Sequence, residues 1–452
     1  MEKFAHSENR YDVKHTLRQH LSHVASLTES YLINGTGHSE GKLAGLLHDL
    51  GKYSDLFQRR LEGKESGLDH WTAGAWVAMA KCQSLAAAFA VYGHHVGLPS
   101  FQELKCISKL VEFEESHPYG LRLSDSDCEH LMARFTEDGL TVNKPANPIF
   151  ISNALSLGDM LDQRRIFSAL TDADFLDTEA HFNGDENGKV YRDPGPALQA
   201  DKALEILHAE LDRLSANSDP GNAITQVRKT ILNNCLGAAN SSTGLFTLTA
   251  PTGSGKTLAM LAFALQHAAK HKLRRVVMVI PYLTITEQTA KIYRDLFEDH
   301  FGPHYVLEHH SLAGMGKENS RSDAEQEQER QRRLLSENWD APIVITTSVQ
   351  MLESLFSNRP SSCRKLHRLS ESVILFDEVQ TLPLHLSVPT LAALSHLAHQ
   401  WRSSVVFSTA TQPAFQHLDS QVAPLVDSGW QPREIVSQPQ QMADQLRRVT
   451  YH

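Results

Sequence analysis

The chain lacks paired cysteines, a leader-like start and any long apolar run. Its five cysteines are scattered without a CxxC pair, which excludes a zinc knuckle or a disulfide framework and is typical of a reducing compartment. The first 15 residues carry no apolar segment behind a basic one. No stretch approaches the roughly 20 apolar residues that span a bilayer. We therefore expect a cytoplasmic protein without contact to a membrane.

The chain also lacks an excess of basic residues. Its 43 basic and 53 acidic residues give a net charge of −10, which disfavours loose, non-specific binding to nucleic acid. A local basic groove can exist on an acidic protein, so a channelled nucleic-acid substrate stays open. Histidine, by contrast, is abundant at 25 residues, and this abundance favours a metal centre.

The apolar pattern divides the 452 residues, which are enough for two to three domains. Residues 1–182 carry helical patterns, clearest in 43–61 and 71–95, and predict an all-α bundle. Residues 183–220 begin with a polar, turn-rich stretch and continue into an amphipathic segment at 196–214. We interpret them as a linker with a bridging helix.

Residues 221–452 alternate short β-rich runs with amphipathic helical patterns. This alternation predicts an α/β domain with a mainly parallel sheet. The expected strands lie within residues 245–250, 275–281, 341–347, 372–378 and 404–410. The charged segment 315–339 predicts a solvated surface helix, which we favour over a DNA contact.

A series of histidines and aspartates stands in the helical half of the chain. Its members are His20, His48, Asp49, His70, His94, His95 and Asp174. Each stands in a helical pattern, so separate helices can bring the side chains to one bundle core, as metal-binding bundles do. Imidazole and carboxylate together favour a first-row transition metal over an all-oxygen magnesium site.

Two aspartates compete with Asp174 for the last position of this series. Asp172 is the nearer alternative, and Asp159 is a more distant one. The residues alone leave this choice open, and the family resemblance given below favours Asp174 through the ADF sequence around it.

Three further residues flank the series. We interpret His15 and His23 as surface histidines of a helix or as residues that support His20. Lys52 has two interpretations of equal weight: a contact to the phosphate of a substrate, or a structural lysine at a helix end.

The second half contains a phosphate-binding loop, APTGSGKT at 250–257. It follows an expected strand and precedes an expected helix, the context that such a loop requires. Backbone N–H groups of the loop can close on a β-phosphate, and the helix N-terminus adds positive potential. We expect Lys256 to reach the β- and γ-phosphates of ATP and Thr257 to ligate magnesium. The expected nucleotide-binding residues are Pro251, Thr252, Gly253, Ser254, Gly255, Lys256 and Thr257.

The sequence DEVQ at 377–380 ends another expected strand. Ligands bind at the carboxyl ends of strands in parallel sheets. We expect Asp377 to hold magnesium through water and Glu378 to orient the attacking water. STAT at 408–411 resembles the helicase motif that couples nucleotide state to strand movement, and segments 281–288 and 345–354 resemble those that touch a single-strand backbone.

The histidine–aspartate series resembles the HD superfamily of metal phosphohydrolases. More narrowly, it is similar to the HD nuclease domain of the CRISPR-associated nuclease–helicases of type I interference systems. LLHDLGK at 46–52, FQRRL at 57–61, GHH at 93–95 and DADFLDTE at 172–179 carry this resemblance. The second half is similar to the superfamily-two helicase lobe of the same family, through the motifs above and residues 355–369.

The resemblance implies a site for two divalent ions, with manganese, nickel, cobalt or iron as candidates. One ion would be held by His20, His48, Asp49 and Asp174, and the other by Asp49, His70, His94 and His95. Catalysis would then involve Asp49 and Lys52 in the HD site and Glu378 in the ATP site.

The resemblance further implies a single-stranded DNA endonuclease and exonuclease fused to a RecA-like lobe of an ATP-dependent helicase. Such a protein degrades target DNA in CRISPR interference together with an RNA-guided effector complex. The family has a second helicase lobe with arginine fingers, which we do not find in these 452 residues. We expect that lobe to be missing or to act in trans, and almost no ATPase activity from this chain alone.

Two other functions stay open from the residues. One is an HD phosphohydrolase that acts on nucleotides, or on a cyclic dinucleotide, under control of an NTPase domain. The other is a non-enzymatic scaffold for the effector complex. Cleavage of circular single-stranded DNA separates the leading interpretation from the nucleotide hydrolase, because a circle has no end to attack.

Overall fold

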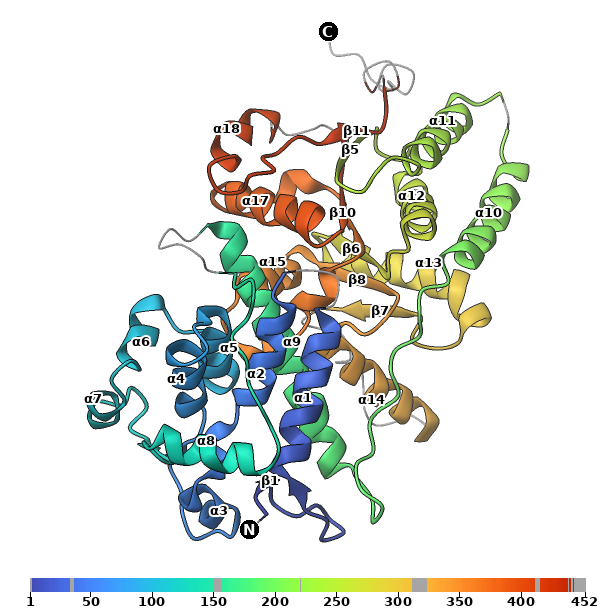
Figure 1. Cartoon of the computed structure of the whole chain (residues 1–452). Coiled ribbons are helices and arrows are strands. Elements are labelled where there is room, and N and C mark those ends of the chain that lie inside the picture. The colour runs from blue at the N-terminus through green and yellow to red at the C-terminus, as the bar shows by residue number, and fades with distance from the viewer. Residues whose placement is uncertain are drawn as a thin grey trace. The chain divides into compact units, whose positions relative to one another are not determined.

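The computed structural model describes residues 2–32, 36–149, 156–219, 221–310, 323–410, 415–437, 439 and 442 (Figure 1). The chain divides into two compact units. The first comprises Met1–Asp193 and Phe356–His367, and the second comprises Pro194–Leu355 and Arg368–His452. A short segment from the second half of the sequence therefore packs with the first unit.

The first unit is helical. Its longer helices are α1 (Leu17–Tyr31), α2 (His38–Leu47), α4 (Thr72–Ala80), α5 (Leu85–Val96), α8 (Cys128–Glu137) and α9 (Leu157–Phe182). Its shorter elements are β1 (Phe4–His6), β2 (His15–Thr16), η1 (Leu50–Tyr53), α3 (Asp55–Leu61), β3 (Leu68–Asp69), α6 (Phe101–Cys106), α7 (Leu110–Glu115), β4 (Arg122–Leu123) and α16 (Pro360–Cys363).

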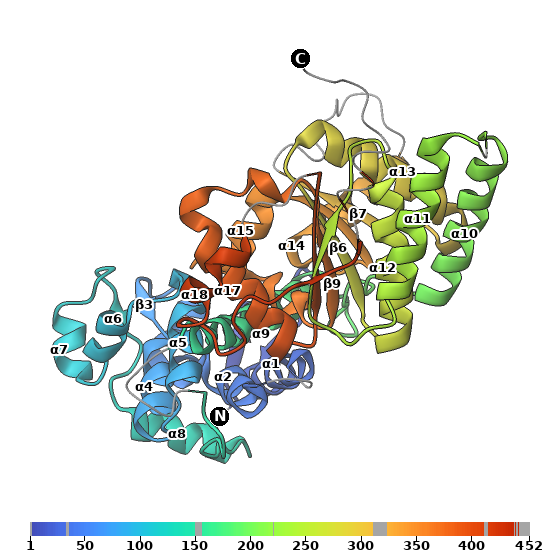
Figure 2. The ribbon, with the colours of Figure 1, turned by 90° about the horizontal axis from the view of Figure 1, so that it is seen from above.

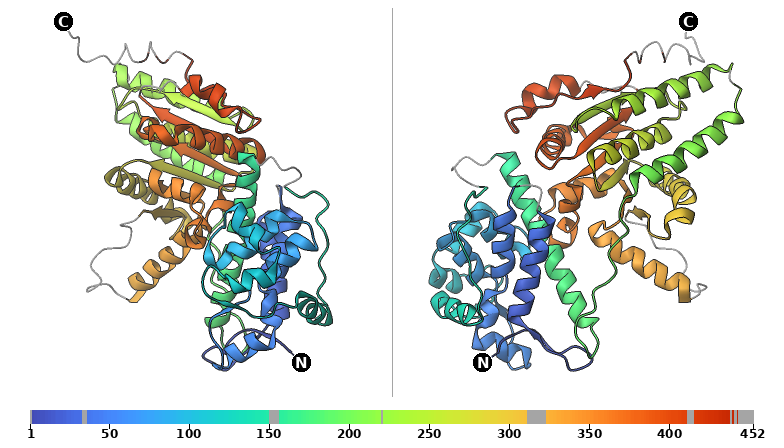
Figure 3. Two further views of the ribbon diagram at one scale, coloured as in Figure 1. Left: turned by 90° about the vertical axis from the view of Figure 1, so that its left-hand side faces the viewer. Right: turned by 45° about the vertical axis from the view of Figure 1, so that its right-hand side comes forward.

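Helix α9 is the centre of this unit. It packs against α1, α2 and α5, as the two views of Figure 3 also show. Its buried residues lie on nearly every side of the helix, and Ile166, Phe167 and Leu170 are completely buried. A helix that is covered all round brings whatever polar side chains it carries into the core.

The two long helical patterns predicted in this half are each broken in the structure. The first stops at Leu47, where α2 gives way to η1, and restarts at α3, which Ser54 caps by accepting a hydrogen bond from Phe57 N. The second breaks between α4 and α5, where Gln83 adopts a positive φ of 55°. These breaks turn the backbone so that side chains near them can point inward.

The second unit is an α/β domain. Its strands are β5 (Leu245–Thr249), β6 (Arg275–Ile280), β7 (Val306–His309), β8 (Ile343–Thr347), β9 (Ser372–Phe376), β10 (Ser404–Thr409) and β11 (Arg433–Glu434). They form one sheet in the order β11-β5-β10-β9-β6-β8-β7, and all pairs are parallel. The predicted α/β domain with a parallel sheet is confirmed, and the prediction missed the short strands β7 and β11.

Helices cover both faces of the sheet (Figure 2). They are α10 (Ala200–Ala216), α11 (Ala223–Ala238), α12 (Lys256–His271), α13 (Leu283–Phe301), α14 (Asp323–Asn338), α15 (Ser348–Phe356), α17 (Leu384–Gln400) and α18 (Asp419–Val422). Side chains of α10 to α13 share one apolar core with alternate residues of the strands. Short 3-10 turns complete the unit: η3 (Leu366–Leu369), η4 (Val379–Thr381) and η5 (Phe415–Leu418).

The predicted bridging helix corresponds to α10, which packs on α12 and α13 within the second unit. Ala203 and Leu207 are completely buried there, whereas Leu214, the last residue of the predicted amphipathic segment, is 42% exposed. Of the charged segment 315–339, residues 323–338 form α14 and residues 315–322 lie outside the described residues. Over the described ranges, every helix is too short or too polar to cross a membrane.

Gly74 permits the close contact between α4 and the end of α2. A methyl group at this position would overlap the carbonyl oxygen of Leu47, which directly precedes His48. We predict that Gly74→Ala lowers the free energy of unfolding of the helical unit by about 1–3 kcal/mol, because neither backbone can yield without repacking. The measurement is thermal unfolding of both proteins by calorimetry.

Gly237→Ala is the matched control. Gly237 lies on the exposed side of α11 with open space around it, so a methyl group there meets nothing. This variant is expected to unfold at the wild-type temperature or slightly above it. Equal unfolding temperatures for both variants would contradict the packing explanation.

Candidate metal centre and nucleotide site

Four members of the predicted series form one buried cluster in the first unit. His20 lies on α1, His48 caps the C-terminus of α2 with Asp49 next to it, and Asp174 lies on α9. His20 Nε2 is 3.1 Å from His48 Nε2, 3.2 Å from Asp49 Oδ2 and 3.4 Å from Asp174 Oδ1. His48 Nε2 is 3.2 Å and 3.5 Å from the same two oxygens. Ligands about 2.1 Å from a shared ion have this spacing.

The remaining members form a second cluster around the same aspartate. His70 Nε2 is 3.3 Å and His94 Nε2 is 3.6 Å from Asp49 Oδ1, and His95 Nε2 is 3.0 Å from His70 Nε2. His94 and His95 lie at the end of α5. His70 was expected on a helix, which is wrong: it stands between β3 and α4, where the turn before the helix directs it inward.

Asp49 joins the two clusters. Its Oδ2 faces His20 and His48, and its Oδ1 faces His70 and His94. The side chain is 1% exposed, and Lys52 Nζ lies 2.6 Å from Oδ2. A carboxylate can bridge two cations in this way because it has two oxygens, each with its own lone pairs.

Backbone contacts set the orientation of the histidines. The Nδ1–H of His48 donates to the Gly45 carbonyl at 2.8 Å, and that of His94 donates to the Val91 carbonyl at 2.6 Å. Because a carbonyl only accepts, each Nδ1 carries a proton, and each Nε2 faces the cluster, where it can bind a metal once it carries no proton of its own. Metal-binding histidines are commonly held by such bonds.

The residues present fit a pair of transition-metal ions. Asp49 Oδ1 and His94 Nε2 are buried and have no hydrogen-bond partner among the described residues. Leaving a buried polar atom unpaired costs about 1–3 kcal/mol, so such atoms at one point indicate a missing ligand. The mixed nitrogen and oxygen donors are those of manganese, iron, cobalt, nickel or zinc sites.

The same contacts change the affinity of the site for protons. Burial lowers the pKa of His20, but hydrogen bonds to Asp174, Asp177 and Asp49 outweigh it and raise this pKa to about 9. Burial likewise opposes protonation of His48, and attraction to Asp49 and Asp174 raises its pKa to about 10. Although burial acts the other way, Lys52 and His48 hold the pKa of the Asp49 carboxyl well below its usual range. Without metal, protons therefore occupy the place of cations.

The two competing aspartates have other partners. Asp172 is completely buried and accepts hydrogen bonds from Arg364 Nε at 3.1 Å and Nη2 at 3.0 Å. Asp159 caps the first turn of α9, where it and Ser156 form a reciprocal capping box. The geometry thus favours Asp174 as the last member of the cluster.

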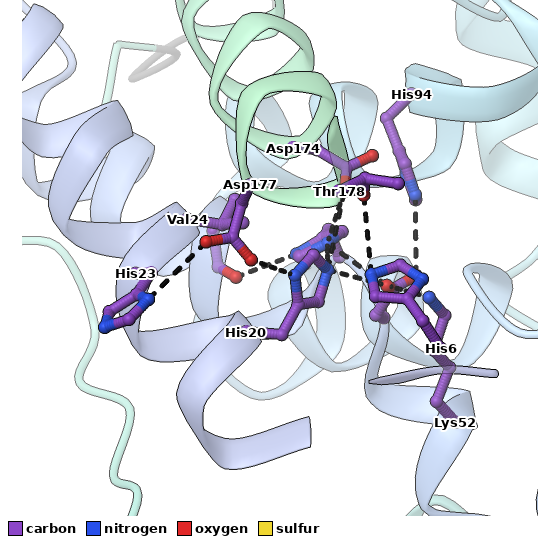
Figure 4. Close-up of polar contacts among 12 residues, drawn as sticks. His6, His20, His23, Val24, Lys52, His94, Asp174, Asp177 and Thr178 are labelled. Carbon is purple, nitrogen blue, oxygen red and sulfur yellow. Dashed lines mark hydrogen bonds and ion pairs between the residues drawn. The ribbon is translucent and has the colours of Figure 1, made fainter. Parts of the chain in front are cut away.

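Asp177 was missed from the sequence, although it stands one helical turn after Asp174. Its Oδ2 accepts a hydrogen bond from His20 Nδ1 at 2.7 Å (Figure 4), which leaves His20 Nε2 free for the cluster. Its Oδ1 accepts from Lys189 Nζ at 2.5 Å and from the Tyr191 hydroxyl at 2.6 Å. The turn-rich stretch interpreted as a linker therefore supports the cluster.

One of two further histidines near the cluster was predicted in part, and the other was missed. His15 was expected at a helix surface or in support of His20. It lies in β2, is 3% exposed, and its ring stands edge-on to His20 with centroids 5.4 Å apart, so the surface alternative is wrong and the supporting one fits. His6 in β1 lies edge-on to His20, with ring centroids 4.8 Å apart. No spacing in the sequence marks His6. His23 is largely exposed, as expected.

The phosphate-binding loop lies between β5 and α12, as predicted. Gly253 and Gly255 have φ values of 76° and 80°, which favour glycine and let the loop turn tightly. Lys256 is the first residue of α12, and its buried Nζ has no hydrogen-bond partner among the described residues. Its nearest carboxylate is Glu378, at 3.8 Å. An unpaired buried lysine beside a glycine turn fits an anionic ligand.

The other two nucleotide motifs stand at the ends of neighbouring strands. Asp377 and Glu378 follow β9, and Ser408 and Thr409 end β10, which lies between β9 and β5. Ser408 Oγ donates to Asp377 Oδ1 at 3.2 Å. Burial raises the pKa of Asp377, although Lys256 opposes this.

A second bond connects the same two motifs. Thr409 Oγ1 donates to Gln380 Oε1 at 2.6 Å. Any shift of β9 relative to β10 must therefore break or move both bonds. Thr411, the last residue of the predicted motif, lies outside the described residues.

Known proteins similar to this chain include helicases and a CRISPR-associated nuclease/helicase. The family model "DEAD/DEAH box helicase" matches residues 225–418. The CRISPR-associated nuclease/helicase Cas3 of Haloferax volcanii is 29% identical over 205 residues, which are 43% of this chain and 22% of that protein. The structure of T. fusca Cas3 with ATP covers 96% of this chain, with 17% sequence identity and a TM-score of 0.58. A second structure of T. fusca Cas3 covers 95% of this chain, with 18% sequence identity and a TM-score of 0.58.

The comparisons confirm the predicted resemblance to the CRISPR-associated nuclease–helicases. The structural match shows a shared fold, a helical region followed by an α/β domain with a parallel sheet. The chain spans about half the length of the solved structures it matches, since it covers 52% of each.

Asp177→Asn tests the support of His20. The amide keeps the shape of the side chain but not the charge, and its single oxygen can accept either from His20 Nδ1 or from Lys189 and Tyr191, but not from both sides. We expect the affinity for Mn²⁺ or Co²⁺ to fall about 10- to 100-fold, measured by competition with a chelator. Glu179→Gln, two residues along α9 and outside the cluster, is the matched control with unchanged affinity. A wild-type affinity in Asp177→Asn would contradict the assigned role.

Metal binding is expected to release protons. At pH 7 the raised pKa values of His20 and His48 keep both protonated in the metal-free protein, and both must lose a proton to bind a metal. The affinity for the metal therefore rises with pH up to about 9 to 10, and it falls at lower pH because protons compete for both histidines. Calorimetric titration with Co²⁺ in buffers of different ionisation enthalpy measures the number released, with about two expected; a value of zero would contradict the protonation states.

Proposed function

We propose that the helical unit is an HD-type nuclease domain that hydrolyses phosphodiester bonds of single-stranded DNA with two bound transition-metal ions. The observation that carries this proposal is the division of Asp49, whose two oxygens face two separate sets of histidines. Manganese, nickel, cobalt and iron suit this donor set. A single-ion site would not need a shared, fully buried carboxylate.

When bound, a pair of such ions polarises a phosphodiester, activates a water molecule and neutralises the leaving oxygen. The chain's own residues hold that site in place. His20, His48 and Asp174 would bind the first ion, and His70, His94 and His95 the second, with Asp49 common to both. Lys52, whose Nζ lies beside Asp49 and lines an adjoining cavity, adds a positive charge where the substrate phosphate would arrive.

The second unit would serve as a RecA-like lobe that binds ATP with magnesium. The glycine turn and the buried Lys256 Nζ, which has no hydrogen-bond partner among the described residues, support a phosphate site, with Pro251, Thr252, Ser254 and Thr257 completing the loop. Asp377 would hold magnesium, and Glu378 would orient the attacking water. Single-stranded DNA and an RNA-guided CRISPR effector complex are the proposed partners, because the curated relative is a CRISPR-associated nuclease/helicase.

Cleavage of circular single-stranded DNA tests the nuclease function. The chain is incubated with the circle and Mn²⁺, Ni²⁺ or Co²⁺, and linear products are followed on a denaturing gel. We expect cleavage with at least one metal and a loss of 10³-fold or more in Asp49→Ala, because this change removes a ligand of both ions.

His130→Ala is the control for this test. His130 is an exposed histidine on α8, outside both clusters, and this variant should cut like the wild type. No cleavage of the circle with any metal would overturn the nuclease proposal. Hydrolysis of nucleotides in place of the circle would support the alternative HD phosphohydrolase, and full function in Asp49→Ala would support a scaffold.

A further inference from the structure

A cavity of about 530 Å³ adjoins the metal cluster of the helical unit. Three predicted metal ligands line it: His70, His95 and Asp174. Its walls come from β1, α3 and the second half of α9. This volume lies within the range of pockets that bind small molecules, so a ligand in the cavity would be in direct reach of the metal site.

Two exposed phenylalanines of α9 border the cavity. Phe175 is 43% exposed and Phe182 is 45% exposed. They stand seven residues apart, with Thr178 between them, so all three lie on one face of the helix. An aromatic ring that stays partly exposed to water contributes less to the stability of the fold than a buried one. The Arg364 guanidinium lies 4.6 Å from the centroid of Phe175, and His6 lies edge-on to Phe182 with ring centroids 5.8 Å apart. These contacts leave part of each ring open to solvent, and a ligand in the cavity would cover it.

Positive charge lies on the opposite wall. Arg60 is exposed and lines the cavity, and so does Lys52, whose Nζ is paired with Asp49 Oδ2 at 2.6 Å. Both cations lie over the ring of Phe57, at 5.3 Å and 5.5 Å from its centroid. The cavity thus presents cations on one side and apolar rings on the other, as in grooves that bind single-stranded nucleic acid.

We propose that Phe175 and Phe182 are a stacking platform for two unpaired nucleobases beside the scissile phosphate, and that Arg60 binds a neighbouring phosphate. The ligand class is a single-stranded polynucleotide, bound without sequence preference because every base has a face to stack. This inference rests on the proposed function and adds to it how the strand is held at the metal site.

The spacing of the two rings distinguishes a polynucleotide from a mononucleotide. Seven residues of α-helix separate the Cα atoms by about 10.5 Å along the axis. Stacked bases are about 3.4 Å apart, so one base cannot contact both rings. A ligand that uses the whole platform therefore has at least two nucleotides. Its bases must also be unpaired, because the bases of a duplex already stack on each other.

The test compares two competitors of one reaction. The full chain, loaded with Mn²⁺, hydrolyses bis(p-nitrophenyl) phosphate, and inhibition by a phosphorothioate tetrathymidylate and by thymidine monophosphate is measured. We expect Phe175→Ala and Phe182→Ala each to raise the inhibition constant of the tetranucleotide about 5- to 100-fold. The inhibition constant of the mononucleotide should change in one of the two variants at most. The tetranucleotide should inhibit Phe182→Trp as tightly as the wild type or more tightly.

A matched control and a second readout complete the test. Tyr119→Ala removes an aromatic ring that is 50% exposed on the same unit but outside the cavity, and it should leave both inhibition constants unchanged. The metal-free Phe182→Trp variant provides the second readout. The tetranucleotide should quench its tryptophan fluorescence more than that of the wild type, and this quenching requires stacking on position 182 but no catalysis. Metal content of each variant shows whether the cluster is intact.

The outcomes separate the two proposals. No hydrolysis of the small phosphodiester or of DNA by the wild type, together with quenching at position 182, refutes the proposed nuclease function and supports the platform. An unchanged inhibition constant in the double Phe175→Ala, Phe182→Ala variant, or the absence of quenching, overturns the platform. If the phenylalanine variants bind less metal and both competitors inhibit them more weakly by the same factor, the rings only support the metal centre, and the platform is overturned.

Discussion

The helical unit depends on the burial of one carboxylate between two groups of imidazoles. A charged aspartate inside a protein is tolerated only when opposite charge or metal compensates for lost hydration. Asp49 meets this requirement through the four histidines around it and through Lys52. Those partners come from separate elements, so α1, α2, α5 and the turn before α4 must all arrive at one point. The contact of Gly74 with Leu47, next to His48, brings two of these elements together.

Neighbouring residues of helix α9 have different roles because the helix points their side chains in different directions. Asp174 and Asp177, three residues apart, both face His20, while Phe175 lies on the cavity side. Asp172 points elsewhere again, to Arg364 of the returning segment. Because successive residues of a helix are rotated by about 100°, four roles fit within six residues without competing for space. A strand, with only two faces, could not separate them.

The nucleotide site uses a different physical device. In a parallel sheet the carboxyl ends of the strands share one edge, and the order of strands decides which motifs meet there. Here β10 lies between β5 and β9, so the phosphate loop, the acidic box and Ser408–Thr409 stand next to one another. The bonds of Ser408 to Asp377 and of Thr409 to Gln380 link the last two directly.

The sequence by itself determined the features that local pattern controls. Residue type and spacing predicted the helical half, five of the strands of the parallel sheet and the glycine loop before Lys256. They also marked the histidines and Asp49 of the histidine–aspartate series, whereas the choice of Asp174 over Asp172 came from the family resemblance. Tertiary structure alone decided which atoms meet. The two oxygens of Asp49 face different histidines, and Asp172 binds Arg364. Asp177 binds His20 and is itself held by Lys189 and Tyr191. It also placed residues 356–367 with the helical unit. Such pairings depend on packing between distant segments, and a carboxylate in a helical pattern carries no local mark of the partner it will find.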